Sequence, residues 1–277
     1  MTEAASEGAR SSGVQPAAAG GNRLGQRYTV PSGWQIATLV GRRSESPSAE
    51  TLVLDVPEWP GHLAGQHLDL RLTAPDGYTA ERSYSLANGP ALPGTSRVEV
   101  TIQRVRDGEV SPYLVDDFPL GSAIEVRGPI GGWFVWDPVH DAGTPVLLLA
   151  GGSGLVPVMS MVRARREAGD RTPFRLIYSV RTAEDRLYTD ELETLVSRGD
   201  GFEASTIFTR AVSLTALRGP RRLTSSELAA WGWPPELEPR VYVCGPTGFV
   251  EAVARMLVAQ GHDPARIRTE RFGPAAG

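Results

Sequence analysis

Four consecutive residues, Arg82-Ser83-Tyr84-Ser85, bring a cation, an aromatic ring and two hydroxyl groups into one short segment. Side chains two residues apart in a strand point to the same face, so Arg82 and Tyr84 would act together. A guanidinium offers paired donors to a phosphate, and a tyrosine ring can stack on a flat heterocycle. Ser85 could then reach the N5 edge of an isoalloxazine. The segment therefore predicts a flavin nucleotide site that serves hydride transfer.

A second segment joins an apolar run, residues 146–150, to Gly151, Gly152, Ser153 and Gly154 and then to a helical pattern. Glycines let backbone amides approach a pyrophosphate, and the following helix start favours its negative charge. A tight strand-to-helix turn without a ligand explains the glycines alone equally well. Their place at the carboxyl end of a buried strand favours a nucleotide, because open α/β sheets bind ligands at that edge.

Two further motifs have simple structural interpretations. Cys244, with Gly245 and Pro246, follows another apolar run, and a lone cysteine at a strand end is usually a small buried hydrophobic residue. Ser111 before Pro112 fits the cap and first position of a short helix.

Together these motifs resemble those of the ferredoxin-NADP reductase superfamily. Arg-x-Tyr-Ser, Gly-Gly-Ser-Gly-Leu-Val-Pro, Cys-Gly-Pro and a terminal Glu-Arg-Phe-Gly occur in that family's order over roughly residues 30–277. The resemblance implies that Cys244 lies beside the nicotinamide ring, though not as a nucleophile, and that Gly245 and Pro246 shape its pocket. It also implies that Phe272 covers the flavin and that Glu270 lies near Ser85.

The same resemblance assigns the remaining nucleotide contacts. It makes residues 151–154 the nicotinamide loop, and it lets the amides of Val110 and Ser111 face the flavin pyrophosphate. Polar residues in the loops after the second and third strands of the second half would surround an adenosine 2′-phosphate: Ser179, Arg181, Thr209, Arg210, Arg221 and Arg222. Thr209-Arg210 stands where NADPH-using members carry Ser-Arg, so NADPH is expected over NADH.

The elements that must position these residues divide the chain at about residue 138. In the first half, the residue pattern predicts six short strands and one short helix near residues 111–118. The expected strands are residues 34–40, 51–56, 67–72, 82–86, 98–105 and 123–126. This pattern favours a small antiparallel β-barrel, although a sandwich would give a similar one. We expect a disordered tail at 1–27, because it is rich in Ala, Gly and Ser, and a flavin domain at 28–138.

The second half, residues 139–277, alternates apolar runs with helical patterns and predicts an α/β domain with a parallel sheet. Its expected strands are residues 146–150, 174–180, 203–208 and 241–244, and its expected helices are 158–169, 190–197, 225–231 and 249–260.

Composition limits the function. With 28 basic and 32 acidic residues the net charge is −4, so no general basic field attracts nucleic acid or anionic lipid. The four histidines show no metal-ligand spacing, and one cysteine cannot hold an iron-sulfur cluster, so any cluster belongs to a partner. No apolar run is long enough to span a membrane and no signal peptide is visible, which predicts a cytoplasmic protein.

We therefore predict a stand-alone two-domain flavoprotein that takes hydride from NAD(P)H onto FAD and passes single electrons to an iron-sulfur, haem or other redox protein. FMN stays open, because Arg-x-Tyr-Ser-Leu-x-Asn also occurs in FMN-dependent reductases of the superfamily. Two alternatives remain: a flavin reductase that supplies reduced flavin to a monooxygenase, and a non-catalytic nucleotide-binding regulatory subunit.

Overall fold

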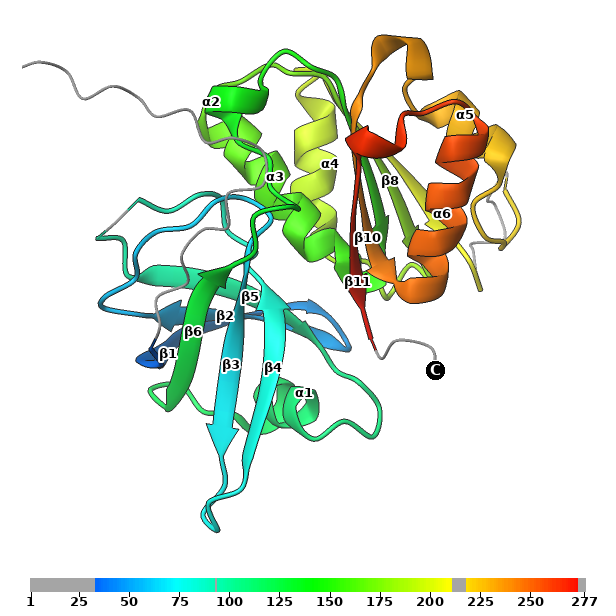
Figure 1. Ribbon diagram of the computed structural model, residues 1–277. Helices are drawn as coiled ribbons and strands as arrows, with labels where there is room; N and C mark the ends of the chain where they lie inside the picture. Colours follow the sequence, from blue (N-terminus) through cyan, green and yellow to red (C-terminus); the bar gives the residue numbers. More distant parts are fainter. Residues whose placement is uncertain (1–32, 93, 211–217, 274–277) are drawn as a thin grey trace, which may run out of the picture.

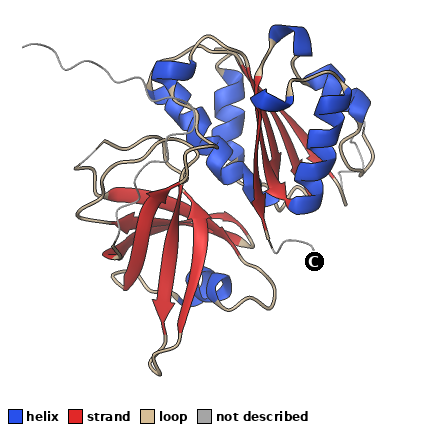
Figure 2. Cartoon of the chain, in the orientation of Figure 1, coloured by secondary structure: helices blue, strands red, loops and turns tan. Residues whose placement is uncertain are grey.

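The computed structural model describes residues 33–92, 94–210 and 218–273, which form an antiparallel β unit followed by an α/β unit (Figure 1). The predicted tail at residues 1–27 lies outside the described residues. Almost all regular structure in the first unit is strand, whereas helices flank the sheet of the second (Figure 2). The two predicted fold classes are thereby confirmed in their predicted order.

Six antiparallel strands build the first unit: β1 (Gln35–Ser46), β2 (Ala49–Asp55), β3 (His67–Thr73), β4 (Thr79–Ser85), β5 (Arg97–Gln103) and β6 (Ala123–Ile130). They form one sheet in the order β4-β3-β6-β1-β2-β5, and its two edge strands meet through an isolated bridge between Leu86 and Val100. One curled sheet surrounds one apolar core, which favours the barrel over the sandwich.

Strand β1 is six residues longer than its predicted end at Val40, because a polar run continues the ladder with β2 through two register shifts. Arg42 in this extension donates to the carbonyl oxygens of Phe118, at 3.0 Å, and of Val115. The extension therefore holds the short helical segment that follows β5.

That helical segment consists of α1 (Val110–Pro112) and a π-helical turn, Tyr113–Asp117. The prediction that Ser111 caps the helix is wrong: Glu109 is the N-cap, without a side-chain bond. Ser111 lies inside the helix, where its Oγ accepts a hydrogen bond from the Val105 amide at 3.0 Å. The serine closes the loop before the helix, which a local sequence pattern does not distinguish from capping.

Five parallel strands build the second unit in the order β11-β10-β7-β8-β9. They are β7 (Val146–Gly151), β8 (Phe174–Val180), β9 (Phe202–Phe208), β10 (Arg240–Pro246) and β11 (Ile267–Phe272). The prediction omitted β11, because its four polar residues between Ile267 and Phe272 differ from the continuous apolar runs of the inner strands.

The helices of this unit are α2 (Pro138–Asp141), α3 (Leu155–Glu167), α4 (Thr189–Ser197), α5 (Ser225–Trp231) and α6 (Thr247–Ala259). Short 3-10 turns lie at Gly152–Gly154, Pro235–Leu237 and Pro264–Arg266. Helices α3 and α4 share one apolar cluster with the sheet, and α5 and α6 share another. The sheet is thus covered on both faces, as Figure 1 shows.

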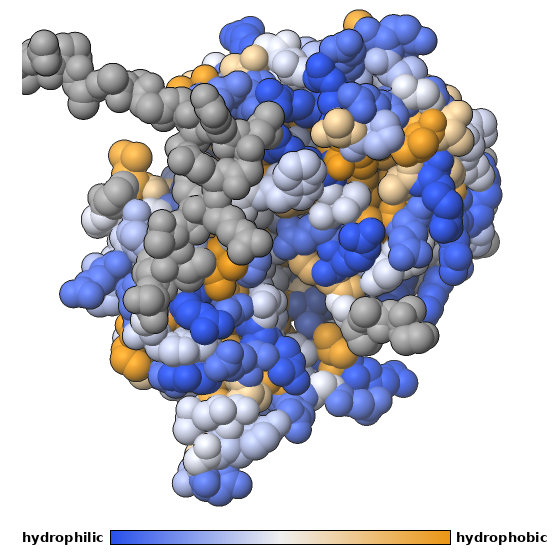
Figure 3. Space-filling view, viewed as in Figure 1, coloured by the Kyte–Doolittle hydropathy of each residue, from blue (hydrophilic) through white to orange (hydrophobic). Residues whose placement is uncertain are grey.

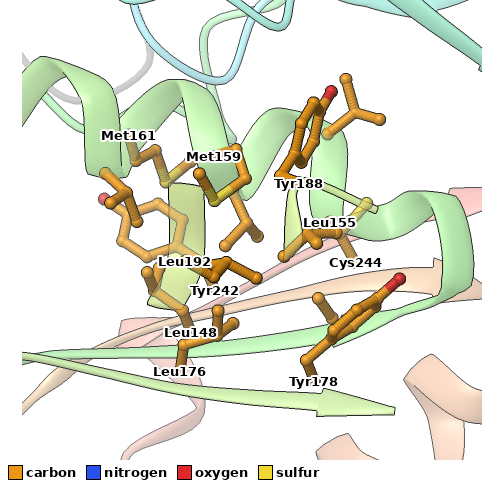
Figure 4. Close-up of a cluster of buried hydrophobic side chains, with 14 of the residues drawn as sticks. Leu148, Leu155, Met159, Met161, Leu176, Tyr178, Tyr188, Leu192, Tyr242 and Cys244 are labelled. Carbon is orange, nitrogen blue, oxygen red and sulfur yellow. The ribbon is translucent and has the colours of Figure 1, made fainter. Parts of the chain in front are cut away.

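The apolar cluster under α3 and α4 also joins the two units. It contains Ala49, Ala64 and Ala87 from the first unit together with Leu155 and Cys244 from the second. Figure 4 shows Cys244 beside Leu155 within this cluster. Because buried side chains of both units pack into one cluster, the motifs of the two halves are held at a shared interface.

None of the described helices is both long and apolar enough to cross a bilayer. On the face shown in Figure 3, hydrophilic side chains predominate and apolar ones form small separate groups.

Candidate functional site

The flavin motif lies on β4, an edge strand of the described sheet. Arg82 is exposed, and its Nη2 lies 3.9 Å from Oε2 of Glu109, the residue before α1. Strand β4 and the start of α1 therefore lie side by side, with the Glu109 carboxylate beside the Arg82 guanidinium. Ser83 belongs to the other face of the strand, where its Oγ donates to Asp69 Oδ1 of β3 at 2.6 Å, so its side chain supports the sheet.

Tyr84 is half-buried and packs against the barrel core. Burial raises the pKa of its phenol to about 12, so the ring stays neutral at physiological pH. Ser85 follows at the end of β4 and is buried, yet its Oγ has no hydrogen-bond partner among the described residues. The end of β4 thus offers an aromatic surface beside a buried, unsatisfied hydroxyl group.

A second unsatisfied oxygen lies at the end of the parallel sheet. Glu270 of β11 pairs in register with Cys244 of β10, and its buried Oε2 has no partner within the described part of the chain. Burial raises the pKa of the Glu270 carboxyl to about 7. The pKa of the fully buried Cys244 thiol rises as well, because of burial and then of the nearby Glu270 charge. Cys244 therefore lacks the thiolate character of a nucleophile.

The chain end passes directly beside this pair. Phe272, at the end of β11, pairs in register with Pro246 and packs against the cluster that contains Cys244. The same cluster contains Ala87, two residues after Ser85. The segment that follows the β4 motif, the Cys-Gly-Pro motif and the terminal aromatic residue therefore share one apolar cluster.

The glycine segment connects β7 to α3 as predicted, with Gly151 ending the strand and Gly152–Gly154 forming a 3-10 turn. A β-carbon at Gly154 would clash with the backbone of Cys244 and Gly245, so only glycine allows this turn to lie against the end of β10. Ser153 is half-buried within the turn. The turn is thus packed on the Cys-Gly-Pro motif.

At the start of α1, Val110 points into the barrel core and Ser111 is buried. Their side chains are therefore occupied within the protein. The expected role of their backbone amides toward a pyrophosphate stays a prediction.

The expected 2′-phosphate residues gather after β8 and β9. Ser179 is the next-to-last residue of β8, and the Arg210 amide donates to the Arg181 carbonyl at 2.9 Å. The Thr209 amide likewise donates to Val180 at 2.9 Å. Both arginines are exposed, so the structure brings together two cations from separate loops.

Arg221 adds less free positive charge than expected, because its Nη2 donates to Glu227 Oε1 at 2.7 Å. The same carboxylate accepts a hydrogen bond from Arg218 Nε at 2.6 Å. This bond is the main cause that lowers the pKa of Glu227 to about 2, and hydrogen bonds from Thr224 add to it. Arg222 is exposed. The sequence analysis missed Arg218 and Glu227, although Thr224-x-x-Glu227 is a capping-box pattern and caps α5.

The hydrogen-bonding state of Ser85 Oγ and Glu270 Oε2 shows whether the site suits a flavin. A buried hydroxyl and a buried carboxyl oxygen without partners are costly, and such groups are normally satisfied by protein, water or ligand. A flat heterocycle with polar edges supplies the missing partners, and the half-buried Tyr84 ring supplies a stacking surface. The residues present therefore fit a flavin.

Comparison with known proteins gives two domain matches, each named by the cofactor it binds. Residues 37–135 match the oxidoreductase FAD-binding domain, and residues 148–255 match the oxidoreductase NAD-binding domain. The two matches fall on the antiparallel and the parallel unit respectively.

Two curated relatives are components of oxygenase systems. The chain is 34% identical over 213 residues to the glycine betaine monooxygenase reductase subunit of Pseudomonas aeruginosa, covering 76% of this chain and 56% of that protein. It is 31% identical over 244 residues to the 2-halobenzoate 1,2-dioxygenase electron transfer component of Burkholderia cepacia, covering 87% of this chain and 67% of that protein. The chain therefore spans little more than half of the first relative.

Among solved structures, the Amycolatopsis cytochrome P450 reductase GcoB superposes with a TM-score of 0.76 at 26% identity. The match covers 90% of this chain and 73% of that one.

Proposed function

Because this chain belongs to the ferredoxin-NADP reductase superfamily and contains its FAD-binding and NAD-binding oxidoreductase domains, we propose that it oxidises NAD(P)H and passes the electrons through FAD to a separate protein. The observation that carries the proposal is a pair of buried oxygens, Ser85 Oγ and Glu270 Oε2, which come from different units and have no hydrogen-bond partner among the described residues. Bound FAD would take a hydride from the nicotinamide and release electrons one at a time.

The residues of the first unit would hold the flavin. Arg82 donates to a phosphate, the amides of Val110 and Ser111 face the same pyrophosphate, and Tyr84 stacks on the ring and keeps water from it. Ser85 Oγ forms a hydrogen bond at the polar edge of the heterocycle. Ser83 contributes through the strand backbone, since its side chain is bonded to Asp69.

The residues of the second unit would receive the nicotinamide. The turn at Gly151–Gly154 presents amides to the pyrophosphate, and Cys244, Gly245 and Pro246 form the wall beside the reacting carbon. Glu270 holds a proton at the flavin edge near neutral pH, consistent with its raised pKa. Phe272 covers the ring until the nicotinamide displaces it.

FAD is proposed over FMN because there is room for an adenosine. The structure has a hollow of about 510 Å³ between the units and a larger one of about 740 Å³ in the first unit. The larger hollow is the one proposed for the adenosine. The larger hollow is lined by Ala80 of β4, by Glu109 and Val110, and by Tyr78 and Tyr113. It begins beside the Arg82–Glu109 contact and provides aromatic surface for an adenine.

NADPH is proposed over NADH on the strength of Arg181 and Arg210, with Ser179 and Thr209 as neutral donors. A phosphate on the ribose would gain charge-assisted hydrogen bonds there that NADH lacks. Glu227, a single carboxylate paired with both Arg218 and Arg221, offsets one of their two positive charges and so limits the preference.

The acceptor is proposed to be an oxygenase or an iron-sulfur protein, because relatives are named as reductase or electron transfer components of oxygenase systems. A four-cysteine cluster would have to come from outside the printed sequence, which has one cysteine.

The test is to purify the chain, identify the chromophore released on denaturation by mass, and follow anaerobic bleaching of the bound flavin by NADPH and NADH. We expect FAD, rapid bleaching and electron transfer to ferricyanide without loss of flavin. Release of reduced flavin during turnover would favour a flavin reductase instead. Nucleotide binding without any bleaching would favour a regulatory subunit, and absence of flavin binding would contradict the proposal.

A further inference from the structure

Helix α3 connects the two cofactor motifs. Its first residue, Leu155, follows the Gly152–Gly154 turn directly, so the helix carries that turn. Along its length the helix passes the loop at residues 86–89, which continues from Tyr84 and Ser85. A displacement of α3 would therefore move the Gly152–Gly154 turn, here called the nicotinamide turn, relative to Arg82–Ser85, the flavin motif.

Three residues on one face of α3 contact three consecutive residues of this loop. Ser160 Oγ donates to the Asn88 carbonyl at 2.8 Å, and Arg163 Nη1 donates to the Ala87 carbonyl at 2.7 Å. Gly89 lies so close to the Glu167 carboxylate that a β-carbon would clash with it. Spacings of three and four residues place these helix residues in one row.

Arg163 is the most firmly held of the three. It is 7% exposed, its Nε and Nη2 donate to the Glu191 carboxylate of α4 at 3.0 and 2.5 Å, and its guanidinium lies 4.8 Å from the ring centre of Tyr188. Tyr188 in turn shares a hydrogen bond with Thr101 of β5. A guanidinium fixed on several sides can set the position of the carbonyl that it binds.

The loop itself is held to the first unit by other bonds. The Leu86 amide donates to Gln66, the Ala87 amide donates to Glu99, and Asn88 Oδ1 accepts from the Glu99 amide, at 2.8–2.9 Å. These bonds do not involve α3. Loss of Arg163 would thus leave the loop folded on the barrel and weaken only its link to the second unit.

We propose that Arg163, supported by Ser160, is a positioning residue that fixes the nicotinamide turn relative to the flavin motif by binding the Ala87–Asn88 backbone. This inference rests on the function proposed above. Arg163 touches neither cofactor in it and acts through α3 and the loop. A displacement of about 1 Å at a hydride donor can lower the rate about a hundredfold, so even a modest loosening is measurable.

Arg163→Leu is the principal variant, because Arg166 Nη1 remains 3.3 Å from Glu191 and still neutralises it. Arg165→Leu is the matched control. Arg165 lies on the same helix and is 2% exposed, but it binds Thr172 and Asp200 within the second unit. Arg163→Lys keeps the charge and one donor, and Ser160→Ala removes a single hydrogen bond with little risk to folding.

Three measurements are made on the FAD-loaded chains: the limiting rate of flavin bleaching by NAD(P)H, the charge-transfer absorption between nicotinamide and flavin, and hydrogen exchange over residues 86–89. In Arg163→Leu we expect a rate lower by about ten- to a hundredfold, a weaker band and faster exchange, with flavin affinity unchanged. Ser160→Ala should shift all three in the same direction by less, and Arg163→Lys should restore part of each. Arg165→Leu should lower the melting temperature and leave the band unchanged.

The inference is overturned if Arg163→Leu, or Ser160→Ala where the former does not fold, matches the parent in rate, band and exchange. It is also overturned if Arg165→Leu weakens the band equally, since the effect would then be general loss of stability. If the parent chain itself is not bleached by either nucleotide, the proposed function fails, and exchange over residues 86–89 alone still shows whether Arg163 links the units.

Discussion

Cys244 and Glu270 stand opposite one another on neighbouring parallel strands, both at the carboxyl edge of the sheet. Opposite residues in adjacent strands point to the same face, so a buried thiol and a buried carboxyl share one small volume. The Glu270 charge raises the pKa of the Cys244 thiol beyond the effect of burial, whereas burial raises the pKa of the Glu270 carboxyl to about 7.

The raised pKa of Glu270 gives a prediction for the flavin-free chain. Its pKa of about 7 lies above the value of 4.5 expected when unfolded, so the folded state binds the proton more tightly. This contribution to stability is fully present below pH 4.5 and is lost as the pH rises through about 7; the total decline in the free energy of unfolding is at most about 3 kcal/mol. Urea unfolding between pH 4.5 and 8 should show a smaller decline in Glu270→Gln than in the parent.

Exposed Glu251 on α6 supplies the control, since Glu251→Gln should keep the parental pH dependence. An identical decline in Glu270→Gln and the parent would show that this carboxyl titrates normally.

Tyr84→Ala should weaken flavin binding because a stacking surface is removed from the end of β4. Aromatic stacking contributes about 0.5–1.5 kcal/mol beyond area burial, so we expect dissociation to be at least several-fold easier. Tyr84→Phe keeps the ring and should bind nearly as well. Flavin fluorescence titration of the three chains checks this, and equal affinity in all of them would remove Tyr84 from the site.

Cys244→Ser should slow flavin reduction more than it weakens nucleotide binding. A residue beside the reacting carbon affects the geometry of the transition state, so the limiting rate falls while the apparent affinity changes little. Stopped-flow bleaching at saturating nucleotide measures both quantities. Loss of affinity at an unchanged limiting rate would leave Cys244 with a packing role only.

Arg210→Ala should reduce the preference for NADPH, because one charge-assisted bond to the 2′-phosphate is worth about 1.5–3 kcal/mol, or roughly ten- to a hundredfold in relative kcat/KM. Glu227→Gln should act in the opposite direction, since Arg218 and Arg221 would lose their counter-charge. Steady-state assays with both nucleotides decide, with Arg175→Ala as a control that breaks a different surface ion pair. A parent that favours NADH would contradict the assignment.

Most strands could be predicted because their apolar runs are locally visible, as at residues 146–150 and 174–180. Strand β11 could not, since its charged residues at one edge of the sheet look like a loop. The site motifs were found as separate segments, but their convergence depends on packing between Ala87, Cys244 and Phe272. Arg163 gave no signal, because an arginine in a helical pattern usually faces solvent, and only the tertiary structure shows its burial.

The open edge of β4 affects the tendency of the flavin-free chain to aggregate. Apart from the bridge at Leu86, the described strand pairs only with β3, so its outer backbone groups are available to another chain. A flavin lying along Arg82–Ser85 would cover them. Newly made chains that lack the flavin would then be prone to aggregate through this edge. The supply of flavin during synthesis would therefore influence the yield of non-aggregated protein.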